Sequence, residues 1–409
     1  MRKQNVAVKE KLPSSFRPFL LMHTGYLVFF NLPSIFINTF FLSIVDDARF
    51  TYMYNIILYL IQGIMMIAGA YALRKIPSRY CTRIGILLSS VGYLLLLLLR
   101  EQSVRFMPLL ALVMGAGGAF YWISFAMLLT DSSSDSNRDK AYSSIGLVGA
   151  VVTLIIPFTS GNIIRSFTDS TGYFVIFGIA FCMAIITVFL SMHIHEKNAE
   201  QGKSRFYEAI QLIKNTRSAK FSYAAIAALG LREGSVSFVL NILLYQMLKD
   251  ERIIGINTFL TGAAAIFANM LCARIMRPNN RVRIFNISTT ILLTICLLLI
   301  FQLNVFTVIL TGMATFALTA LMNNAANSVY FAAFDDTGLT SALRPEMFAI
   351  KEVILGAGRI AGIFILYFLP PTFFWCAIGL IILTGLQYIT GALCHLSVTA
   401  RKREKELQQ

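Results

Sequence analysis

Hydrophobic residues in this chain gather into long runs that shorter polar segments separate. Most runs are close to the roughly 20 residues that a helix needs to cross the hydrocarbon core of a bilayer. Because unpaired backbone groups are too costly in lipid, each run must be helical. The pattern therefore predicts twelve transmembrane helices, over residues 17–43, 51–73, 82–99, 106–130, 141–164, 172–192, 221–248, 254–273, 284–302, 305–331, 347–369 and 372–397.

The composition agrees with an all-α membrane protein. Of the 409 residues, 57% are hydrophobic and only 13% are charged, whereas about a quarter of the residues of a soluble domain are charged. The net charge of +15 is also typical of nucleic-acid binding, but the positive residues lie at the ends of the apolar runs and form no dense basic tract. We therefore expect the lipid bilayer as a partner and no nucleic acid.

Lysine and arginine are unevenly divided between alternate connecting segments. With a cytoplasmic N-terminus, the inner segments hold 26 of the 35 lysines and arginines and the outer loops hold six. Cytoplasmic loops of membrane proteins carry such an excess. The distribution predicts a multi-pass protein of the plasma membrane, with both termini in the cytoplasm.

A long polar stretch divides the runs into two sets of six. This predicts an N-terminal six-helix bundle over 1–192, a cytoplasmic linker over 193–220 and a C-terminal six-helix bundle over 221–409. Within the linker, Phe206 and Ile210 begin an apolar pattern at helical spacing, which predicts a short amphipathic helix.

The two halves also resemble each other at an offset near 200 residues. The loop ALRKIPSRYCTRIG after the second run and the loop ARIMRPNNRVRIFN after the eighth both place arginines around a proline and end in Arg-Ile. Parallel repeats of six spans are typical of transporters, with the pathway between the repeats.

The first of these loops carries a resemblance to a known family. In GAYALRKIPS, Gly69 and Arg74 match the pattern Gly-x3-Asp-Arg/Lys-x-Gly-Arg-Arg/Lys, although Leu73 stands at the acidic position, and the second copy keeps Arg274 and Arg277. On these residues the chain resembles the major facilitator superfamily. The resemblance implies two pseudo-symmetric six-helix bundles, transport by alternating access, and a gating role for the four matching residues.

Away from the span ends, five charged residues fall inside the predicted spans: Arg232 and Glu233 in the seventh, and Lys351, Glu352 and Arg359 in the eleventh. A charge at the centre of a bilayer costs roughly 2.5–3.5 kcal/mol, so these side chains must face protein or water. Lys351 lies nearest the cytoplasmic end and can extend its ammonium group to the interface.

We interpret Glu233 and Glu352 as candidates for proton coupling, and Arg232 and Arg359 as partners of a carboxylate or of an anionic substrate group. Glu352 and Arg359 share one helix face, roughly 10 Å apart. The structural alternative is an ion pair that locks two helices together. Buried ion pairs add little net stability, because desolvation offsets their attraction, which favours the functional interpretation.

Polar stripes on four further stretches predict a cavity. According to the resemblance, spans one, four, seven and ten line the central cavity. These spans supply the cavity-lining candidates His23, Asn31, Asn38, Tyr121, Trp122, Ser237, Asn241, Asn323, Asn327 and Tyr330. The alternative is that such stripes join neighbouring helices by hydrogen bonds.

These observations predict a secondary active transporter, working as a monomer, that exports a small organic solute by proton antiport. The alternatives are a flippase for a lipid-linked or amphiphilic anionic molecule and a non-transporting membrane sensor. No Gly-x4-Gly-Lys-Ser/Thr loop for ATP occurs in the sequence. The six cysteines form no CxxC pair. We therefore expect no enzyme activity, no cofactor and no metal site.

Overall fold

The computed structural model describes residues 13–132, 138–167, 169–194, 202–302, 304–333, 342–370 and 372–407, and every regular element in these ranges is helical. The short helix α8 (Phe206–Asn215) connects two groups of helices. The N-terminal helices are α1 (Phe16–Asn31), α2 (Phe36–Val45), α3 (Ala48–Leu73), α4 (Ser78–Leu99), the 3₁₀ helix η1 (Arg100–Val104), α5 (Met107–Asp131), α6 (Arg138–Arg165) and α7 (Thr171–Ser191). The C-terminal helices are α9 (Arg217–Leu248), α10 (Glu251–Ile275), α11 (Arg281–Phe301), α12 (Val305–Ala332), α13 (Arg344–Phe368), α14 (Phe373–Gly385) and α15 (Gln387–Glu406).

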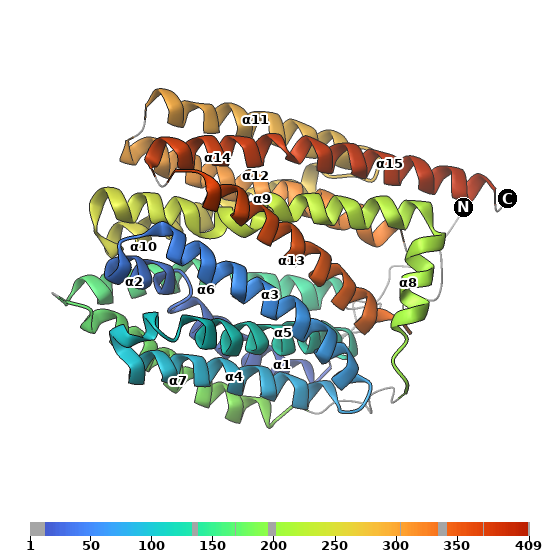
Figure 1. The fold of residues 1–409 in the computed structure, drawn as a ribbon. Coiled ribbons are helices and arrows are strands. Elements are labelled where there is room, and N and C mark those ends of the chain that lie inside the picture. Colours follow the sequence, from blue (N-terminus) through green and yellow to red (C-terminus); the bar gives the residue numbers. More distant parts are fainter. Residues whose placement is uncertain are drawn as a thin grey trace, which may run out of the picture.

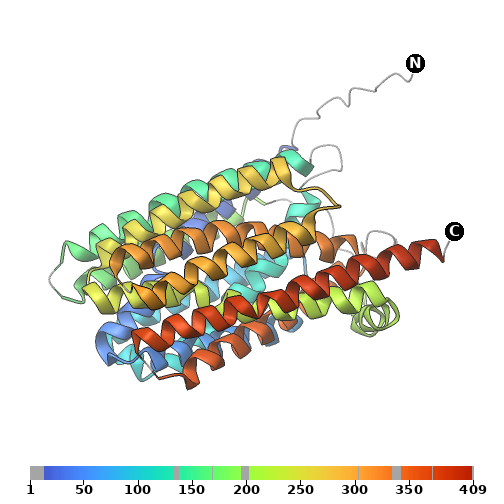
Figure 2. The same ribbon diagram turned by 90° about the horizontal axis from the view of Figure 1, so that it is seen from above.

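The long helices run side by side along one direction, and α8 lies across them at one end (Figures 1 and 2). The N-terminal and C-terminal helices occupy opposite sides of the view in Figure 1, and they meet where α3 packs against α13 and α6 packs against α10. The C-terminal end of α15 projects at the same end as α8. We call this end the α8 end and the other the α2 end.

Eleven helical stretches of the described residues are long and apolar enough to cross a membrane. Helix α13, which matches the predicted span 347–369, is not among them. It has 25 residues, enough to cross a core of roughly 30 Å at about 1.5 Å per residue. However, its charges at Lys351, Glu352 and Arg359 lower the hydropathy of its sequence. The count of twelve spans therefore stays a prediction.

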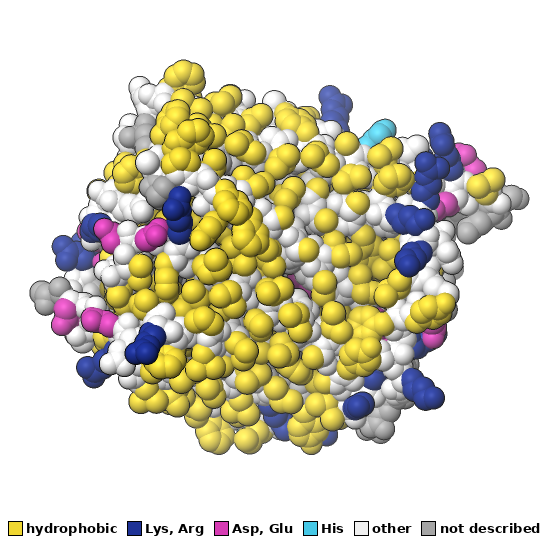
Figure 3. Space-filling model, in the orientation of Figure 1, with side chains coloured by type: hydrophobic (Ala, Val, Ile, Leu, Met, Phe, Trp, Pro, Cys, Tyr) yellow, Lys and Arg dark blue, Asp and Glu magenta, His cyan; other side chains and the backbone are white. Residues whose placement is uncertain are grey.

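Hydrophobic and charged side chains are distributed over the surface as a bilayer requires. On the face shown in Figure 3, hydrophobic side chains cover a broad belt, and charged side chains gather at its two ends. Large apolar side chains such as Leu98, Phe267 and Phe301 are well exposed. Exposed apolar area on this scale is unfavourable in water and marks a membrane-contacting surface.

Two predicted spans are each built from two helices. Pro33 lies between α1 and α2, where a proline cannot donate the backbone hydrogen bond that a continuous helix needs. The run predicted over 372–397 breaks between α14 and α15 and then continues as helix to Glu406. The sequence pattern located both spans but missed these interruptions.

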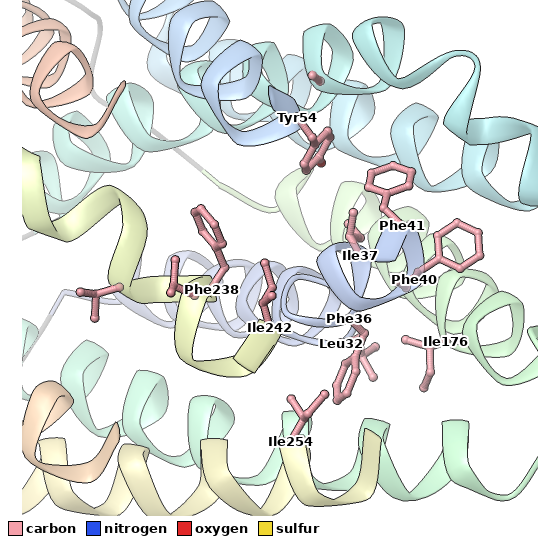
Figure 4. Packing of buried hydrophobic residues seen from close by; sticks show 14 of the residues in the cluster. Leu32, Phe36, Ile37, Phe40, Phe41, Tyr54, Ile176, Phe238, Ile242 and Ile254 are labelled. Atoms are coloured by element: carbon pink, nitrogen blue, oxygen red, sulfur yellow. The ribbon is translucent and has the colours of Figure 1, made fainter. Parts of the chain in front are cut away.

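At the α2 end, one apolar core joins the two groups of helices. Phe36 and Ile37 of α2 lie close to Phe238 and Ile242 of α9 and to Ile254 of α10 (Figure 4). These side chains are buried within a single cluster that includes residues of both groups. The α2 end is therefore closed by packed hydrocarbon.

Polar contacts also join the two groups of helices at the α2 end. The Lys249 ammonium group donates to the Asp46 carboxylate at 2.8 Å, and the Tyr173 hydroxyl donates to Glu251 at 2.6 Å. Arg165 lies 3.6 Å from the carboxylate of Asp250. Each of these contacts joins an N-terminal helix or its flanking turn to α10 or its flanking turn.

The predicted internal repeat has a structural counterpart at the start of α3 and α10. Asp46 and Lys249, about 200 residues apart, both adopt left-handed backbone conformations, with φ of 53° and 49°. Each is followed by an aspartate, Asp47 or Asp250, whose side chain caps the next helix. This capping satisfies a backbone N–H that the first turn of a helix leaves unpaired. The same turn therefore occurs once in each half of the chain.

Candidate functional site

A cavity of about 530 Å³ lies among α1, α2, α3, α4, α5, α9 and α13. Pockets that hold small molecules have a similar size, and they combine a mainly apolar wall with a few polar groups. Most of the wall here is aromatic or aliphatic. Its polar and charged side chains are Ser34, Asn38, Asn55, Gln62, Ser89, Glu233, Glu352 and Arg359.

Glu233 of α9 and Arg359 of α13 form an ion pair on the cavity wall. The Arg359 guanidinium group donates to Glu233 Oε1 at 2.8 Å, and the two side chains are 16% and 28% exposed, respectively. The guanidinium carbon also lies 5.2 Å from the centre of the Tyr59 ring, which places the cation against an aromatic side chain of α3. A paired charge that is still accessible from a cavity can exchange partners with a ligand.

Glycines bring α9 and α13 close enough for this pair. Gly230 of α9 packs against Gly358 of α13, and Gly234 packs against Arg359. Gly362 lies so close to Leu231 of α9 that a methyl group on it would overlap the Leu231 carbonyl oxygen. Small residues spaced by four positions let two helix backbones approach in this way. The sequence contains this spacing in both helices, as Gly358-x3-Gly362 in α13 and as Gly230-x3-Gly234 in the stretch GLREG of α9.

Glu352 also lies on the cavity wall, and its cationic neighbour is Lys351. The Lys351 ammonium group is 3.6 Å from Glu352 Oε1 and 5.9 Å from the centre of the Phe348 ring. This separation is longer than that of the Glu233 pair. Consecutive residues of a helix point in different directions, which explains the poorer geometry.

The structure places Arg232 away from this cavity. Its side chain points into the C-terminal helices, where its N–H groups donate to hydroxyls of Thr315, Thr319 and Thr384 at 2.6–3.3 Å. Arg232 is 3% exposed. Arg232 and Glu233 are adjacent in sequence, but their side chains point to different parts of the protein. Of the two candidate arginines, Arg359 lines the cavity and Arg232 does not.

The candidates from the first and fourth spans divide between the cavity and the core. Asn38 and Trp122 line the cavity, and Asn38 accepts a hydrogen bond from Asn55 at 2.8 Å. His23 and Tyr121 are buried in the N-terminal helices, hydrogen-bonded to each other at 2.7 Å. Asn31 donates to the backbone carbonyl of Leu27 in its own helix.

Four cavity-lining candidates from the seventh and tenth spans, Asn241, Asn323, Asn327 and Tyr330, are not among the described residues that line the cavity. Asn241 of α9 accepts from Asn257 at 3.0 Å, as Asn38 does from Asn55 in the other half. Asn327 donates to the carbonyl of Asn323 within α12, and the Tyr330 hydroxyl pairs with Tyr223. The side chain of Ser237 lies outside the described residues.

The helices that supply the cavity wall therefore differ from those expected. The polar stripe of α12 was expected on the wall because of the resemblance, but α12 packs against α10 and α11, where Asn324 donates to Asn269. Helix α3 supplies Asn55, Tyr59 and Gln62 instead. The periodicity of α3 gave no signal for them, because these polar residues are embedded in an apolar run.

At the α8 end, Arg74 joins the two groups of helices through Glu346 at the start of α13. Its guanidinium group donates to both Glu346 oxygens, at 2.8 and 2.7 Å, and to the backbone carbonyl of Ala342. The backbone N–H of Arg205 donates to the same carboxylate at 3.0 Å. The Glu346 side chain is 0% exposed. The sequence indicated Arg74 but not Glu346.

The other three gating candidates lie elsewhere. Gly69 is buried against Ile123 of α5, whereas Arg274 and Arg277 are exposed at the end of α10 and in the turn that follows it. Near the Arg74 contact, a hydrogen bond from the Arg205 guanidinium group holds the pKa of the exposed Glu208 carboxyl on α8 below its ordinary value. The salt bridge of Arg74 has no counterpart at Arg274, the equivalent position of the second half, among the described residues.

Replacing Arg74 by alanine is expected to lower the free energy of unfolding by about 3 kcal/mol, because it leaves the Glu346 carboxylate buried without its cation. The measurement is the midpoint of thermal unfolding of the purified protein. Arg274→Ala removes the corresponding exposed arginine of the other half and is the matched control, with an expected change within about 0.5 kcal/mol. Equal midpoints for the two variants would show that the buried contact contributes little.

Comparisons with known proteins agree with this architecture. A profile of the Major Facilitator Superfamily matches residues 19–344. The protein YqgE of Bacillus subtilis (strain 168) is 23% identical over 314 residues, which cover 76% of this chain and 72% of that protein. Among solved structures, the nucleoside transporter NupG is similar, with a TM-score of 0.69 and 11% identity over 94% of this chain and 99% of that chain.

A bacterial homologue of the human drug peptide transporters PepT1 and PepT2 has a TM-score of 0.66, with 13% identity over 96% of this chain and 98% of that chain. At such low identities the solved structures show the fold alone. The family match covers well over half of the sequence and confirms the resemblance that the repeated loop indicated. The chain belongs to the major facilitator superfamily.

Proposed function

We propose that this protein is a secondary active transporter that carries a small organic solute through the cavity by alternating access. The observation that carries the proposal is the Glu233–Arg359 ion pair on the cavity wall. Charged side chains inside membrane spans are costly and are kept where a substrate or ion passes. A pair that served stability alone would gain little from its position beside a cavity.

We further propose that Glu233 and Glu352 couple transport to protons, and that the direction is export. Both carboxylates line the cavity, and each lies beside a cation that can stabilise its ionised form. A carboxylate that alternates between a cation and a proton can link proton movement to the exchange of solute. The direction of transport rests on the family resemblance.

The test is flux in proteoliposomes that enclose a pH-sensitive dye, with a panel of small organic cations, anions and neutral solutes on the outside. A transported solute should move protons in the native protein. Glu233→Gln and Glu352→Gln should abolish this coupled flux, with Glu208→Gln on α8 as a control that retains it. Unchanged coupled flux in both cavity variants would refute the coupling proposal.

The contacts at the two ends of the bundle support alternating access. Asp46–Lys249 and Tyr173–Glu251 join the two groups of helices at the α2 end, and Arg74–Glu346 joins them at the α8 end. A transport cycle that opens each end in turn would have to separate these contacts in turn. The Asp46–Lys249 pair at the α2 end is more exposed than Arg74–Glu346 and separates at less cost.

We propose twelve spans, with α13 as the eleventh, in two six-helix bundles over 1–192 and 221–409 that the linker 193–220 connects. We place the α8 end and both termini in the cytoplasm, and the monomeric protein in the plasma membrane. Positive residues favour this orientation. Cysteine labelling of intact cells tests it: Arg105→Cys should react with an impermeant reagent, and Gln211→Cys should react only after permeabilisation.

The alternative functions receive less support. A flippase that grips an anionic head group with two arginines would need Arg232 and Arg359 together, but Arg232 points into the C-terminal helices. A non-transporting sensor would gain nothing from charged residues on a cavity wall.

A further inference from the structure

The cavity wall carries more carboxylates than cationic groups. Glu233, Glu352 and Arg359 line the cavity, and Arg359 is engaged with Glu233. The remaining carboxylate, Glu352, has Lys351 as its neighbouring cation, at 3.6 Å. Lys351 itself is not among the residues that line the cavity. The wall therefore presents one more carboxylate than cation to whatever occupies the cavity.

Aromatic rings share the cavity wall with this extra carboxylate. Phe348 and Trp122 line the same cavity, and the Lys351 ammonium group lies 5.9 Å from the centre of the Phe348 ring and 5.7 Å from that of Tyr330. Rings at such distances attract a cation through the negative charge of their faces. A carboxylate with aromatic rings beside it is the arrangement that recognises substituted ammonium ions.

Lys351 makes some of the contacts that a substituted ammonium ion would make with this carboxylate and these rings. Its ammonium group contacts the rings and the carboxylate, although Lys351 is not one of the lining residues, and the geometry of consecutive helical residues keeps its distance from Glu352 long. A mobile cation in the cavity is free of that restriction and can approach Glu352 directly. It would also gain contacts with the apolar wall, which a lysine fixed to α13 cannot make.

We propose that the cavity binds a small organic cation with an apolar or aromatic substituent, with its charge against Glu352, and that Lys351 is a tethered counter-ion which the ligand replaces. This assignment rests on the proposed transport function and names its substrate class. It predicts that removing the Lys351 charge strengthens binding of an organic cation, because the ligand then has no competitor for the carboxylate.

The probe is benzyltrimethylammonium, with phenylmethanesulfonate as the anion of similar size. The chain has two tryptophans, so that in a Trp375→Phe background the fluorescence of Trp122 reports occupation of the cavity. We expect the cation to bind and the sulfonate to bind more weakly. Lys351→Gln should strengthen binding of the cation about threefold, and Glu352→Gln should weaken it about tenfold.

Glu352→Asp keeps the negative charge and should retain most of the binding. This control shows whether the weaker binding of Glu352→Gln comes from the lost charge or from misfolding at this position. Glu208→Gln on α8 should leave binding unchanged. Preference for the sulfonate, unchanged binding in Glu352→Gln, or unchanged or weaker binding in Lys351→Gln would each overturn the proposal.

The outcome is separable from that of the transport proposal. Proteoliposomes that carry another solute while the cation fails to bind would remove the cation site and retain the transporter. Binding of the cation with the expected variant effects, without flux of any solute in the panel, would retain the site and remove the transporter.

Discussion

Coupled flux is expected to fall to background when Arg359 is replaced by glutamine. The variant leaves the Glu233 carboxylate in the cavity wall without the guanidinium group that donates to it at 2.8 Å. The free energy of unfolding should fall as well, by about 1–3 kcal/mol, since an unpaired and partly buried charge keeps its desolvation penalty. Proteoliposome flux and the thermal midpoint of the purified variant measure the two effects.

The double variant Glu233→Gln/Arg359→Gln separates folding from function. It removes both charges, so the midpoint should recover relative to Arg359→Gln alone, with a coupling energy of about 0.5–3 kcal/mol between the two positions. Coupled flux should stay at background. A double variant that transports normally would show that the pair is a structural contact between α9 and α13.

The second large effect is expected at Gly362. A methyl group there would overlap the carbonyl oxygen of Leu231, which belongs to the backbone of α9 and cannot rotate away. Gly362→Ala should therefore force the two helices apart and lower the free energy of unfolding by about 1–3 kcal/mol. Flux should fall with it, because separation of the backbones also separates Glu233 from Arg359.

Gly356→Ala, on the same helix, is the matched control. The added carbon would lie 3.7 Å from the carbonyl oxygen of Tyr59, an ordinary contact distance. Its thermal midpoint should stay near that of the native protein. If both alanine variants melt at the same temperature, the close approach of α9 and α13 is not what holds the site together.

The sequence predicted the elements of this fold well, because hydrophobic length is a direct requirement of the bilayer. Every predicted apolar run corresponds to helix, including the run at 347–369 that became α13. The repeated loop around Arg74 was enough to identify the family that the profile then confirmed. Intramembrane charge was the signal for Glu233, Glu352 and Arg359, and all three line the cavity.

The directions of side chains were harder to predict. A helical stripe shows which residues share a face, but not which neighbour that face meets. The polar stripe of α12 therefore faces other helices, where Asn324 donates to Asn269. The Arg232 side chain points toward three threonines and not toward the cavity. Salt bridges between residues distant in sequence, such as Arg74 and Glu346, could not be predicted, because the sequence around neither residue specifies its partner.

The salt bridge between Asp46 and Lys249 bears on how such a protein arose. The two residues occupy equivalent turns of the repeat, and their side chains contact each other. In an ancestral homodimer of six-span subunits, this position would have faced its own copy, and two identical charges there would have repelled each other. An attractive pair at this point requires the two copies to differ. A single chain meets this requirement, because its two halves can carry opposite charges at equivalent positions.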